Sequence, residues 1–343
     1  MKRLLAAATA AAGLLVVAGL LSGLWVHLQL TTPYLGAPDG EVYVEVPRGS
    51  GTRAVARLLA GRGVLRSRLP FLLYLRWTGS EGRIQAGEYR FDQPATPREI
   101  ARRLTTGDVY FRSITVPEGL TAEETAGLLA ENGFGTLPEL RRALRRTEWV
   151  GDLAPKARSL EGYLYPETYR FDRGADAEAV IRKMTEQFRS AVSRTLGEHP
   201  LPEGWDIPRI VTLASLIEKE VRAREEGPMV ASVLVNRLER GMTLGCDATI
   251  IYAMKLAGSW EGRLGKADLR MDSPYNSYLH RGLPPGPICN PGASSLVAAL
   301  RPAATDYLYY VSRNDGTHQF SRDYAAHREA VYRYQQAPFR KRN

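Results

Sequence analysis

Apolar and polar residues are unevenly distributed along this chain, and its longest apolar run comes first. Residues Leu4–Leu28 form 25 consecutive positions without a formal charge. As a helix rising 1.5 Å per residue, this run would be roughly 38 Å long, enough to cross the ~30 Å hydrocarbon core of a bilayer with some tilt. A cleavable signal has a shorter apolar stretch of about 7–15 residues. The pattern therefore predicts an uncleaved single-span anchor, with a removed signal as the alternative.

The basic residues beside this run indicate its orientation. Lys2 and Arg3 precede it, and the next basic residue is Arg48. Since positive charges favour the cytoplasmic side of a membrane, residues 1–30 are expected to form a cytoplasmic tip and transmembrane anchor. Everything after about residue 30 should then lie outside, on the periplasmic or extracellular face of the cytoplasmic membrane.

Two related patterns follow the apolar run. Val46–Gly63 aligns without a gap on Val116–Gly133, 70 positions later, and Tyr89–Leu104 is echoed by Tyr169–Met184. Repeats at a fixed offset indicate a duplicated structural unit, and two copies are too few for a solenoid. We interpret the pattern as duplication of a small α+β unit.

Each copy is predicted to contain a strand, a Pro–Gly turn and a short amphipathic helix. Thr52 and Thr121 are the expected N-caps, and the helices should end at Gly63 and Gly133. The duplication divides the chain after the anchor into three parts. Residues 31–110 are the first unit, 111–198 the second, related unit with a connector, and 199–343 a C-terminal domain.

Two features of these units have alternative interpretations. The first copy resembles the glycan-binding LysM module in its V-x-x-G-x-(x)-T-x-x-x-x-A pattern, and plain structural duplication explains the same pattern. Leu160–Phe171 contains four aromatic residues. It is either a sugar-stacking surface or a strand packed into an inter-domain seam.

Two glutamates stand out in an otherwise apolar helical pattern. A helix is predicted from the N-cap Asp206 to a stop at Glu225–Pro228. At 100° per residue, Glu218 and Glu220 fall on opposite borders of its apolar stripe. Glutamate is rarely buried unless it is paired or functional, but spacing alone leaves both a catalytic and a solvated role open. The expected polar face holds Thr212, Ser215, Lys219, Arg222 and Glu226.

The overall charge narrows the class of partner. The 46 Lys and Arg residues exceed the 37 acidic residues, which gives a formal net charge of +9. A basic surface suits nucleic acid, phospholipid headgroups or an anionic cell-wall polymer, and the predicted location outside the cell excludes nucleic acid. His280 and His327 lack partners at metal-ligand spacing, so neither a metal nor another cofactor is expected.

Several motifs follow one another in a recognisable order. They are LEGYLYPETY, ASLIEKE, VASVLVNRL, GMTL..D.TIIYA, PYNSY…GLPPGPI.NPG and YLYYV……H.F. Together with the N-terminal span and the first repeat, this series resembles the endolytic murein transglycosylases, the YceG-like (MltG) family. The resemblance implies an α+β fold with an N-terminal transmembrane helix, LysM-like α+β subdomains and a C-terminal mixed α/β catalytic domain.

The resemblance also implies a reaction. The chain would be a lytic transglycosylase, a lyase that cleaves N-acetylmuramic acid–N-acetylglucosamine bonds in nascent glycan strands and leaves 1,6-anhydro ends. Glu218, the first glutamate of EKE, matches the family's catalytic acid, which afterwards acts as the base. Because a glutamate with a pKa of about 4.3 is almost fully ionised at pH 7, we expect partial burial to favour its acid form.

The family motifs also indicate partners and substrate-binding residues. Peptidoglycan strands are the expected substrate, with peptidoglycan synthases (penicillin-binding proteins) as implied neighbours. Two other functions stay open: a non-enzymatic LysM-type wall-binding scaffold, and a lysozyme-like hydrolase that uses the same acid. The ten residues expected to bind substrate, each of which also has a structural alternative, are Asn236, Asp247, Thr249, Tyr252, Tyr275, Asn276, Tyr278, Asn290, His318 and Phe320.

The chain departs from the family pattern in one motif. Where the family usually has Leu-Gln-(Ser/Thr)-Asp-Pro-Thr, this chain has LGCDAT. Gly245 removes an amide side chain and Ala248 a stiffening proline, so the substrate contacts are expected to differ here. Cys246 and Cys289 lie in two loops of the predicted cleft. A disulfide between them is one hypothesis for an oxidising exterior, and two free thiols are the other.

Overall fold

The computed structural model describes residues 2–36 and 40–337, with side chains from residue 9 onward. The described helices and strands form a mixed α/β fold that divides into two compact units. The first unit holds residues 1–112 and 170–174, and the second holds residues 113–169 and 175–343. The four-part division made from the sequence stays a prediction.

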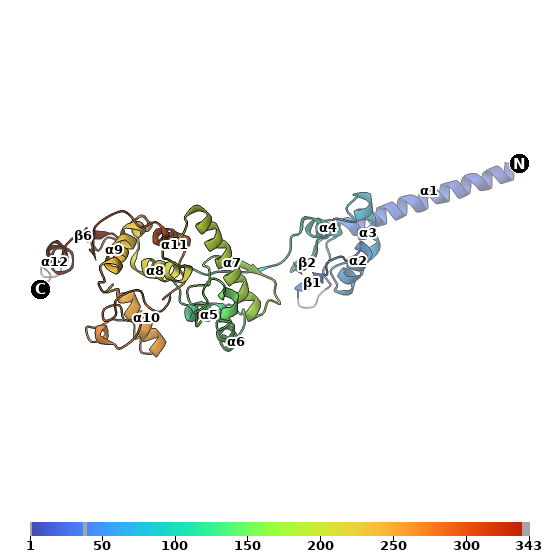
Figure 1. Ribbon diagram of the computed structural model, residues 1–343. Coiled ribbons are helices and arrows are strands. Elements are labelled where there is room, and N and C mark those ends of the chain that lie inside the picture. The colour runs from blue at the N-terminus through green and yellow to red at the C-terminus, as the bar shows by residue number, and fades with distance from the viewer. Residues whose placement is uncertain (1, 37–39, 338–343) are drawn as a thin grey trace. The chain divides into compact units, whose positions relative to one another are not determined.

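The apolar N-terminal run forms one long helix, α1 (Lys2–Thr31; Figure 1). Within it, Thr9–Thr31 is long and apolar enough to cross a membrane. Its side chains are not part of a core, since Leu14, Leu15 and Leu20 are 69–74% exposed. The C-terminal end of α1 packs against the first unit. An exposed apolar helix of this length fits a single-pass anchor, and its orientation stays a prediction.

The first unit packs a two-stranded sheet against helices. Strands β1 and β2 pair antiparallel, with Val42 opposite Phe91 and Val46 opposite Gly87. The inward residues of both strands, Val46 and Phe91 among them, join the helices in one apolar core. After α1, the elements are β1 (Val42–Val46), α2 (Thr52–Gly61), α3 (Arg68–Trp77), β2 (Gly87–Phe91) and α4 (Pro97–Thr106).

The second copy of the repeat has the same order of elements. Its strands β3 and β4 pair in a second two-stranded sheet. Helix α5 begins 70 residues after α2, and α7 begins 80 residues after α4, as the sequence repeat predicts. The resemblance of either copy to LysM stays a prediction. The elements are β3 (Arg112–Thr115), α5 (Ala122–Glu131), α6 (Leu137–Ala143), the 3₁₀ turn η1 (Thr147–Val150), β4 (Thr168–Phe171) and α7 (Ala177–Glu198).

The C-terminal ends of α2 and α5 have the same construction. The glycines predicted to end these helices, Gly63 and Gly133, adopt left-handed φ values of +73° and +71°. The next residue in each copy donates its backbone N–H to the carbonyl five positions earlier, at 2.9 Å. This is the hydrogen-bond pattern of a Schellman motif, so the predicted helix ends are confirmed in both copies.

The N-terminal ends of the same helices differ. Thr121 is the N-cap of α5, and it forms a reciprocal capping box with Glu124. The prediction for Thr52 is wrong, because Gly51 is the N-cap of α2 and Thr52 is already helical. The Thr52 hydroxyl donates instead to the carbonyl of Glu81. The C-terminal ends of α2 and α5 are therefore more similar to each other than their N-terminal ends are.

The rest of the second unit surrounds one central helix, α8. It contacts α9, α10 and α11, which come from three later segments of the chain (Figure 1). A hairpin, β5–β6, follows them. The elements are α8 (Ile207–Glu220), η2 (Arg224–Glu226), α9 (Gly227–Glu239), α10 (Asp247–Ala257), η3 (Asp268–Arg270), α11 (Ala293–Leu300), β5 (Tyr309–Ser312), β6 (His318–Ser321), α12 (Tyr324–Val331) and the π-helical turn η4 (Tyr332–Gln336).

Helix α8 is buried even where a polar face was expected. Thr212 is 4% exposed and Ser215 is fully buried. Their hydroxyls donate 2.7 Å hydrogen bonds to carbonyls of the same helix, at positions 208 and 212. Because these polar groups are satisfied within the helix, they can pack against neighbouring helices without an unpaired donor. The predicted polar face is wrong at these two positions.

The start of α8 matches the prediction, but its end does not. Asp206 caps the helix by accepting from the N–H of Arg209. The helix stops at Glu220, because Val221 is extended, with φ −94° and ψ 129°. The predicted stop at Glu225–Pro228 is wrong: Pro228 lies in the first turn of α9. Proline suits that turn since its missing N–H would have no helical partner there.

The capping box of α5 gives a testable difference between the two copies. We expect Thr121→Ala to lower the free energy of unfolding by about 1 kcal/mol, because the capping hydroxyl is lost. In thermal denaturation of the full chain, the midpoint should fall by roughly 2–4 °C. Thr52→Ala is the matched control, and its midpoint should move less. Equal shifts of both variants would contradict this assignment of the caps.

Candidate functional site

Glu218 lies in the last turn of α8, where the helix emerges from the core. Its side chain is half-buried, and Oε2 accepts a 2.9 Å hydrogen bond from the backbone N–H of Gly292, just before α11. Gly119, in the Pro–Gly turn of the second repeat, also approaches it: a Cβ on this glycine would stand 3.6 Å from the Glu218 Cγ. Gly119 in turn donates its N–H to the carbonyl of Asn290, at 2.9 Å. The repeat turn and the loop before α11 thus enclose this carboxyl from two sides.

A cavity of about 160 Å³ lies beside Glu218. It contains two acids and two arginines, and one of each is paired: Arg224 Nη2 lies 3.0 Å from Glu118 Oε2. Arg222 is exposed at its rim. The Glu218 carboxyl is therefore accessible to a ligand. The lining residues are Glu118, Ile217, Glu218, Val221, Arg222, Arg224, Gly227, Ser294 and Ser295.

A lysine lies on the same side of α8 as this cavity. The Lys219 ammonium donates a 3.2 Å hydrogen bond to the carbonyl of Gly119. A Cβ on Gly119 would lie 3.8 Å from Lys219 Nζ, about as close as it would lie to the Glu218 side chain. Lys219 therefore brings a positive charge to the Gly119 turn that approaches Glu218.

Glu220 belongs to a separate polar cluster. The Tyr310 hydroxyl donates a hydrogen bond to its carboxylate. Burial raises the pKa of Glu220; the Tyr310 bond opposes this rise and the charge of Asp247 adds to it. Burial therefore favours the acid form of Glu220.

Four of the ten predicted binding residues gather around the Glu220 cluster. The Tyr278 hydroxyl donates to Asp247 Oδ1 at 2.5 Å. His318 is 10% exposed at its side chain, with Nδ1 2.7 Å from a carboxylate oxygen of Glu226. The rings of His318 and Phe320 lie 5.3 and 6.3 Å from that of Tyr310. These residues surround Glu220 rather than Glu218.

Two more predicted residues lie near a third carboxyl group, Glu161. It is 8% exposed and accepts hydrogen bonds of 3.0–3.1 Å from the N–H of Ala122, the first residue of α5. The Tyr252 hydroxyl donates to it at 3.2 Å, and the Tyr252 and Tyr275 rings meet edge to face at 4.9 Å. Burial raises the pKa of Glu161 to about 8, although the Ala122 and Tyr252 bonds oppose the rise. Glu161 is therefore mostly protonated at neutral pH.

The last four predicted binding residues connect segments of backbone. Asn236 donates to the carbonyls of residues 305 and 307, and Asn276 to those of residues 269 and 271. Asn290 donates to the carbonyl of residue 120 and accepts from the N–H of residue 164. Thr249 is fully buried and donates to the carbonyl of Cys246. These bonds shape the loops of the site, and direct contact with a substrate stays a prediction.

Sequence reasoning missed Glu118, Glu161, Tyr310 and Gly292. Glu161 had a usable signal, because it precedes a glycine in an aromatic segment. Gly162 has φ +84°, and a Cβ there would lie 2.4 Å from Pro287. A position that accepts only glycine marks a close backbone approach, and the acid beside it is consequently buried. Glu118, Tyr310 and Gly292 had no comparable signal, because their neighbours come from distant parts of the chain.

The aromatic segment Leu160–Phe171 is packed. Tyr163, Tyr169 and Phe171 are only 3–4% exposed, and residues 168–171 form β4. Rings that are buried in this way cannot stack on a sugar. The packed-strand interpretation is confirmed for Tyr169 and Phe171 of β4, and sugar stacking by these three buried rings is wrong.

The disulfide hypothesis for Cys246 and Cys289 is wrong: both are buried free thiols. Cys246 lies among Glu220, Arg237 and Asp247. Cys289 donates its thiol to the carbonyl of Ser215, at 3.3 Å. The two sulfurs have different neighbours, so each fills a position of its own in the core.

The departure at Gly245 has a conformational reason. This residue adopts φ +62°, and its N–H donates to the carbonyl of Ser277 at 2.9 Å. A residue with a side chain would be strained in this backbone conformation. The chain therefore uses glycine to join the loop before α10 to the loop that carries Tyr278.

Comparisons with known proteins cover nearly the whole chain. A model of the YceG-like family matches residues 44–333. A Bacillus subtilis (strain 168) protein named endolytic murein transglycosylase is 33% identical over 309 residues, which are 85% of this chain and 84% of that protein. A Streptococcus pneumoniae (strain D39) protein of the same name is 26% identical, over 79% of this chain and 54% of its own length.

A solved structure is similar as well. It is the crystal structure of a yceG-like protein from Listeria monocytogenes, 28% identical in sequence, with a TM-score of 0.57. The match covers 85% of this chain and 99% of that chain. The likeness therefore extends over both units of the fold and is not limited to the motifs around α8.

The buried acid Glu161 predicts a pH dependence of stability. Below its ordinary pKa of 4.5, both the folded and the unfolded chain hold this proton. Between pH 4.5 and about 8, the folded state keeps a proton that the unfolded state releases, so the contribution of Glu161 to stability falls as the pH rises. Relative to Glu161→Gln, the wild-type melting midpoint should fall by roughly 3–5 °C per pH unit in this window.

Thermal denaturation of both proteins at several pH values from 5 to 8 measures this dependence. Glu131→Gln, which changes an exposed acid at the end of α5, is the control and should follow the wild type. A difference between wild type and Glu161→Gln that stays constant over this range would show that Glu161 is ionised in the folded chain.

Proposed function

This chain belongs to the YceG-like family, and we propose that it is a membrane-anchored endolytic peptidoglycan transglycosylase in which Glu218 carries the proton. Helix α1 would anchor it in the cytoplasmic membrane, with its N-terminus in the cytoplasm and the second unit outside. There it would cleave N-acetylmuramic acid–N-acetylglucosamine bonds in new glycan strands, beside the peptidoglycan synthases.

The enzyme class rests on the relatives. The Bacillus subtilis and Streptococcus pneumoniae proteins are both named endolytic murein transglycosylases, and the first match covers 84–85% of both chains. The chain is accordingly a murein transglycosylase, a lyase that acts on peptidoglycan. Its net charge of +9 is compatible with an anionic cell-wall polymer as substrate.

One observation favours Glu218 as the acid: among the three carboxyl groups described above, it is the one that lines a cavity. A general acid must come within hydrogen-bond reach of the leaving oxygen. Glu161 is enclosed by α5 and two tyrosines, and Glu220 by Tyr310 and its neighbours. Access therefore separates Glu218 from the two carboxyls that burial keeps closer to neutral.

The proposed reaction uses one carboxyl group twice. Oε2 of Glu218 accepts from the Gly292 N–H, which leaves Oε1 to carry the proton. A bound glycan strand would exclude water from the cavity, and loss of water favours a neutral carboxyl. Glu218 would then protonate the glycosidic oxygen as the bond to the muramic acid C1 breaks, while the substrate's own N-acetyl group stabilises the cationic centre.

The second half of the reaction closes the sugar ring. The carboxylate that has given up its proton removes one from the muramic acid C6 hydroxyl, whose oxygen forms the bond to C1. The product carries a 1,6-anhydro end, and the proton returns to Glu218, so no water is consumed. The Gly292 N–H would hold this carboxylate in place through its hydrogen bond to Oε2, and the Lys219 ammonium lies on the Gly119 turn beside it.

In this proposal Glu220 is a positioning residue. Its contact with Tyr310 links the end of α8 to the β5–β6 hairpin, and Asp247 links the same cluster to the start of α10. The residues that the family motifs indicated for substrate binding lie on these elements. Glu220 would therefore fix the position of these substrate-binding residues relative to Glu218.

The first test is digestion of purified peptidoglycan by the full chain, with mass spectrometry of the new glycan ends. Glu218→Gln should lower the rate of formation of 1,6-anhydro ends by about 10²–10⁴-fold, because the proton shuttle is lost. Glu239→Gln, an exposed acid at the end of α9, is the matched control and should keep full activity. Reducing ends in place of anhydro ends would identify a hydrolase with the same acid. Tight binding to unchanged glycan by the folded wild type would indicate the wall-binding scaffold.

A second pair of variants distinguishes the two glutamates of α8. Glu220→Gln keeps a neutral hydrogen-bonding group beside Tyr310, so we expect activity within about tenfold of wild type, with an unchanged pH optimum. Glu220→Ala should raise KM more than it lowers kcat, because it loosens the wall of the site. If Glu220→Gln abolishes the formation of anhydro ends while Glu218→Gln retains it, the proton shuttle is Glu220.

A further inference from the structure

Helix α3 of the first unit exposes an apolar stripe. Leu69, Leu73 and Trp77, four positions apart on one face of the helix, are 54%, 43% and 78% exposed. Residues spaced by four in a helix lie above one another and form a continuous surface. Trp77 is more exposed than Leu14, Leu15, Leu20, Leu21, Leu24 and Leu28 of α1, which range from 53% to 74%. Such a stripe is unusual on the surface of a water-soluble unit.

The opposite face of α3 makes the core contacts of this helix. Phe71 and Leu75 are fully buried in the core of the first unit. The stripe is therefore not needed for packing of the helix against its own unit. A helix that is apolar on both faces calls for a second apolar environment.

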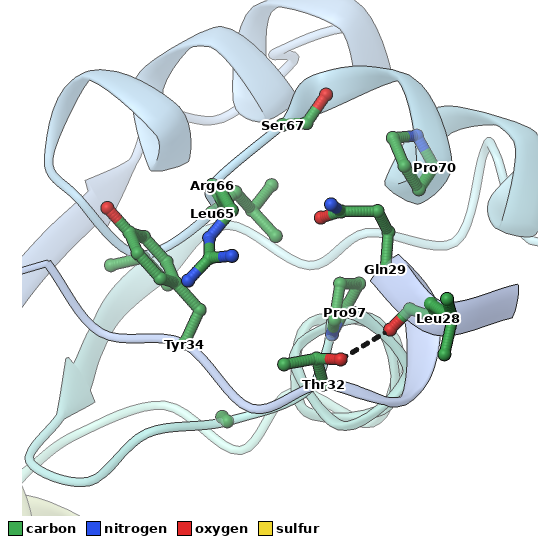
Figure 2. Close-up of a pocket in the computed structure, with 11 residues that line it drawn as sticks. Leu28, Gln29, Thr32, Tyr34, Leu65, Arg66, Ser67, Pro70 and Pro97 are labelled. Atoms are coloured by element: carbon green, nitrogen blue, oxygen red, sulfur yellow. Dashed lines mark hydrogen bonds between the residues drawn. The ribbon is translucent and has the colours of Figure 1, made fainter. Parts of the chain in front are cut away.

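The start of α3 lies at the end of the membrane-spanning stretch. Leu28 and Gln29 of α1 line the same cavity, of about 260 Å³, as Ser67 and Pro70 at the beginning of α3. Figure 2 shows Gln29 and Pro70 facing each other across this cavity. Because the span in α1 ends at Thr31, the stripe begins next to the level at which the chain would leave the bilayer.

The charged residues of α3 are all positive. Helix α3 contains Arg68 and Arg76 and no acidic residue. Arg66, just before it, and both of these arginines are exposed. Arg66 also lies over the ring of Tyr34, 5.0 Å from its centroid. Arginines beside exposed Trp and Leu are the composition of helices that lie in the headgroup region of anionic membranes.

The second copy of the repeat provides an internal comparison. With the N-caps Ser67 and Thr136 aligned, α6 corresponds to α3, and its Leu140 and Leu144 are buried like the core residues of α3. The stripe positions then correspond to Pro138, Arg142 and Arg146, all exposed. The same fold is therefore built without the stripe, so the stripe of α3 is not a requirement of the repeat.

We propose that α3 is an interfacial helix, which inserts Leu69, Leu73 and Trp77 into the headgroup region of the membrane leaflet that α1 leaves, with Arg66, Arg68 and Arg76 on anionic lipid headgroups. This rests on the anchoring by α1 that the proposed function includes. A helix in the interface plane holds the first unit against the bilayer.

Fluorescence quenching by lipid tests this contact. The full chain is reconstituted in vesicles of phosphatidylethanolamine and phosphatidylglycerol whose acyl chains are brominated close to the headgroup. Difference spectra between wild type and Trp77→Phe isolate the signal of Trp77. Trp25→Phe isolates a residue of the span as the reference for insertion, and Trp149→Phe a residue of the second unit. We expect Trp77 to lose a fraction of its fluorescence comparable with that of Trp25, and Trp149 to lose much less.

Two changes should remove the quenching of Trp77 without affecting that of Trp25. The double variant Leu69→Ser, Leu73→Ser removes two of the three apolar side chains of the stripe and keeps Trp77 as the probe. Replacement of phosphatidylglycerol by phosphatidylcholine removes the partner of the three arginines, and the same loss should follow from high salt. Both changes leave the buried residues of α3 intact, so the fold of the first unit is maintained.

The outcomes separate this inference from the anchoring itself. Quenching of Trp25 without quenching of Trp77 overturns the interfacial role of α3 and leaves the anchor in place. If neither tryptophan is quenched, α1 is not inserted, and both the anchor and this inference fail. Trp77 that is inaccessible to a water-soluble quencher and yet not quenched by brominated lipid is covered by protein, either the second unit or another copy of the chain, which also overturns the proposal.

Discussion

Burial of α8 is the constraint on which the rest of the second unit depends. Every residue from Ile210 to Ile217 is at most 4% exposed, so the helix reaches solvent only at its two ends, and its last turn is the one that lies beside the cavity. The chain places Glu218, Lys219 and Glu220 there, and the extended Val221 turns the backbone away immediately afterwards. Neighbours differ on each side of this turn. One carboxyl therefore lines a cavity, and the other is enclosed by Tyr310 and its neighbours.

Much of the fold could be predicted because its signals are local. The apolar run predicts α1, and the 70-residue offset predicts that α5 repeats α2 with the same glycine-ended C-terminus. Errors arose where a local signal has two meanings. Proline at position 228 marks both a helix stop and a helix start, and threonine at position 212 suits both a solvated face and a core in which its hydroxyl bonds back to its own helix. Tertiary contacts decide between such meanings.

The candidate site was harder to predict than the fold, because its chemistry depends on distant segments. Motifs correctly indicate loops that meet around α8, but they do not show how a polar side chain is used. The side chains of Asn276 and Asn290 make hydrogen bonds to backbone groups, so both residues can be buried without unpaired polar atoms. Partial burial on a helical wheel was expected to favour a neutral Glu218. In the structure, Glu220 is the glutamate that interacts with Tyr310 and Asp247. These neighbours come from distant parts of the chain, so the helical periodicity could not predict them.

Duplication gave this chain two copies of one small fold whose surfaces now differ. In the second copy, the Pro–Gly turn ends in Gly119, whose carbonyl holds Lys219 and whose Cα faces Glu218. In the first copy, a Cβ on the equivalent, exposed Gly49 would meet nothing within 4 Å, while α3 presents an apolar stripe that α6 lacks. Both copies keep the buried face of the helix, since their cores require it. The exposed positions are free to diverge. The second copy contributes Gly119 to the candidate site, and the exposed face of α3 in the first copy suits the membrane surface that we propose for it.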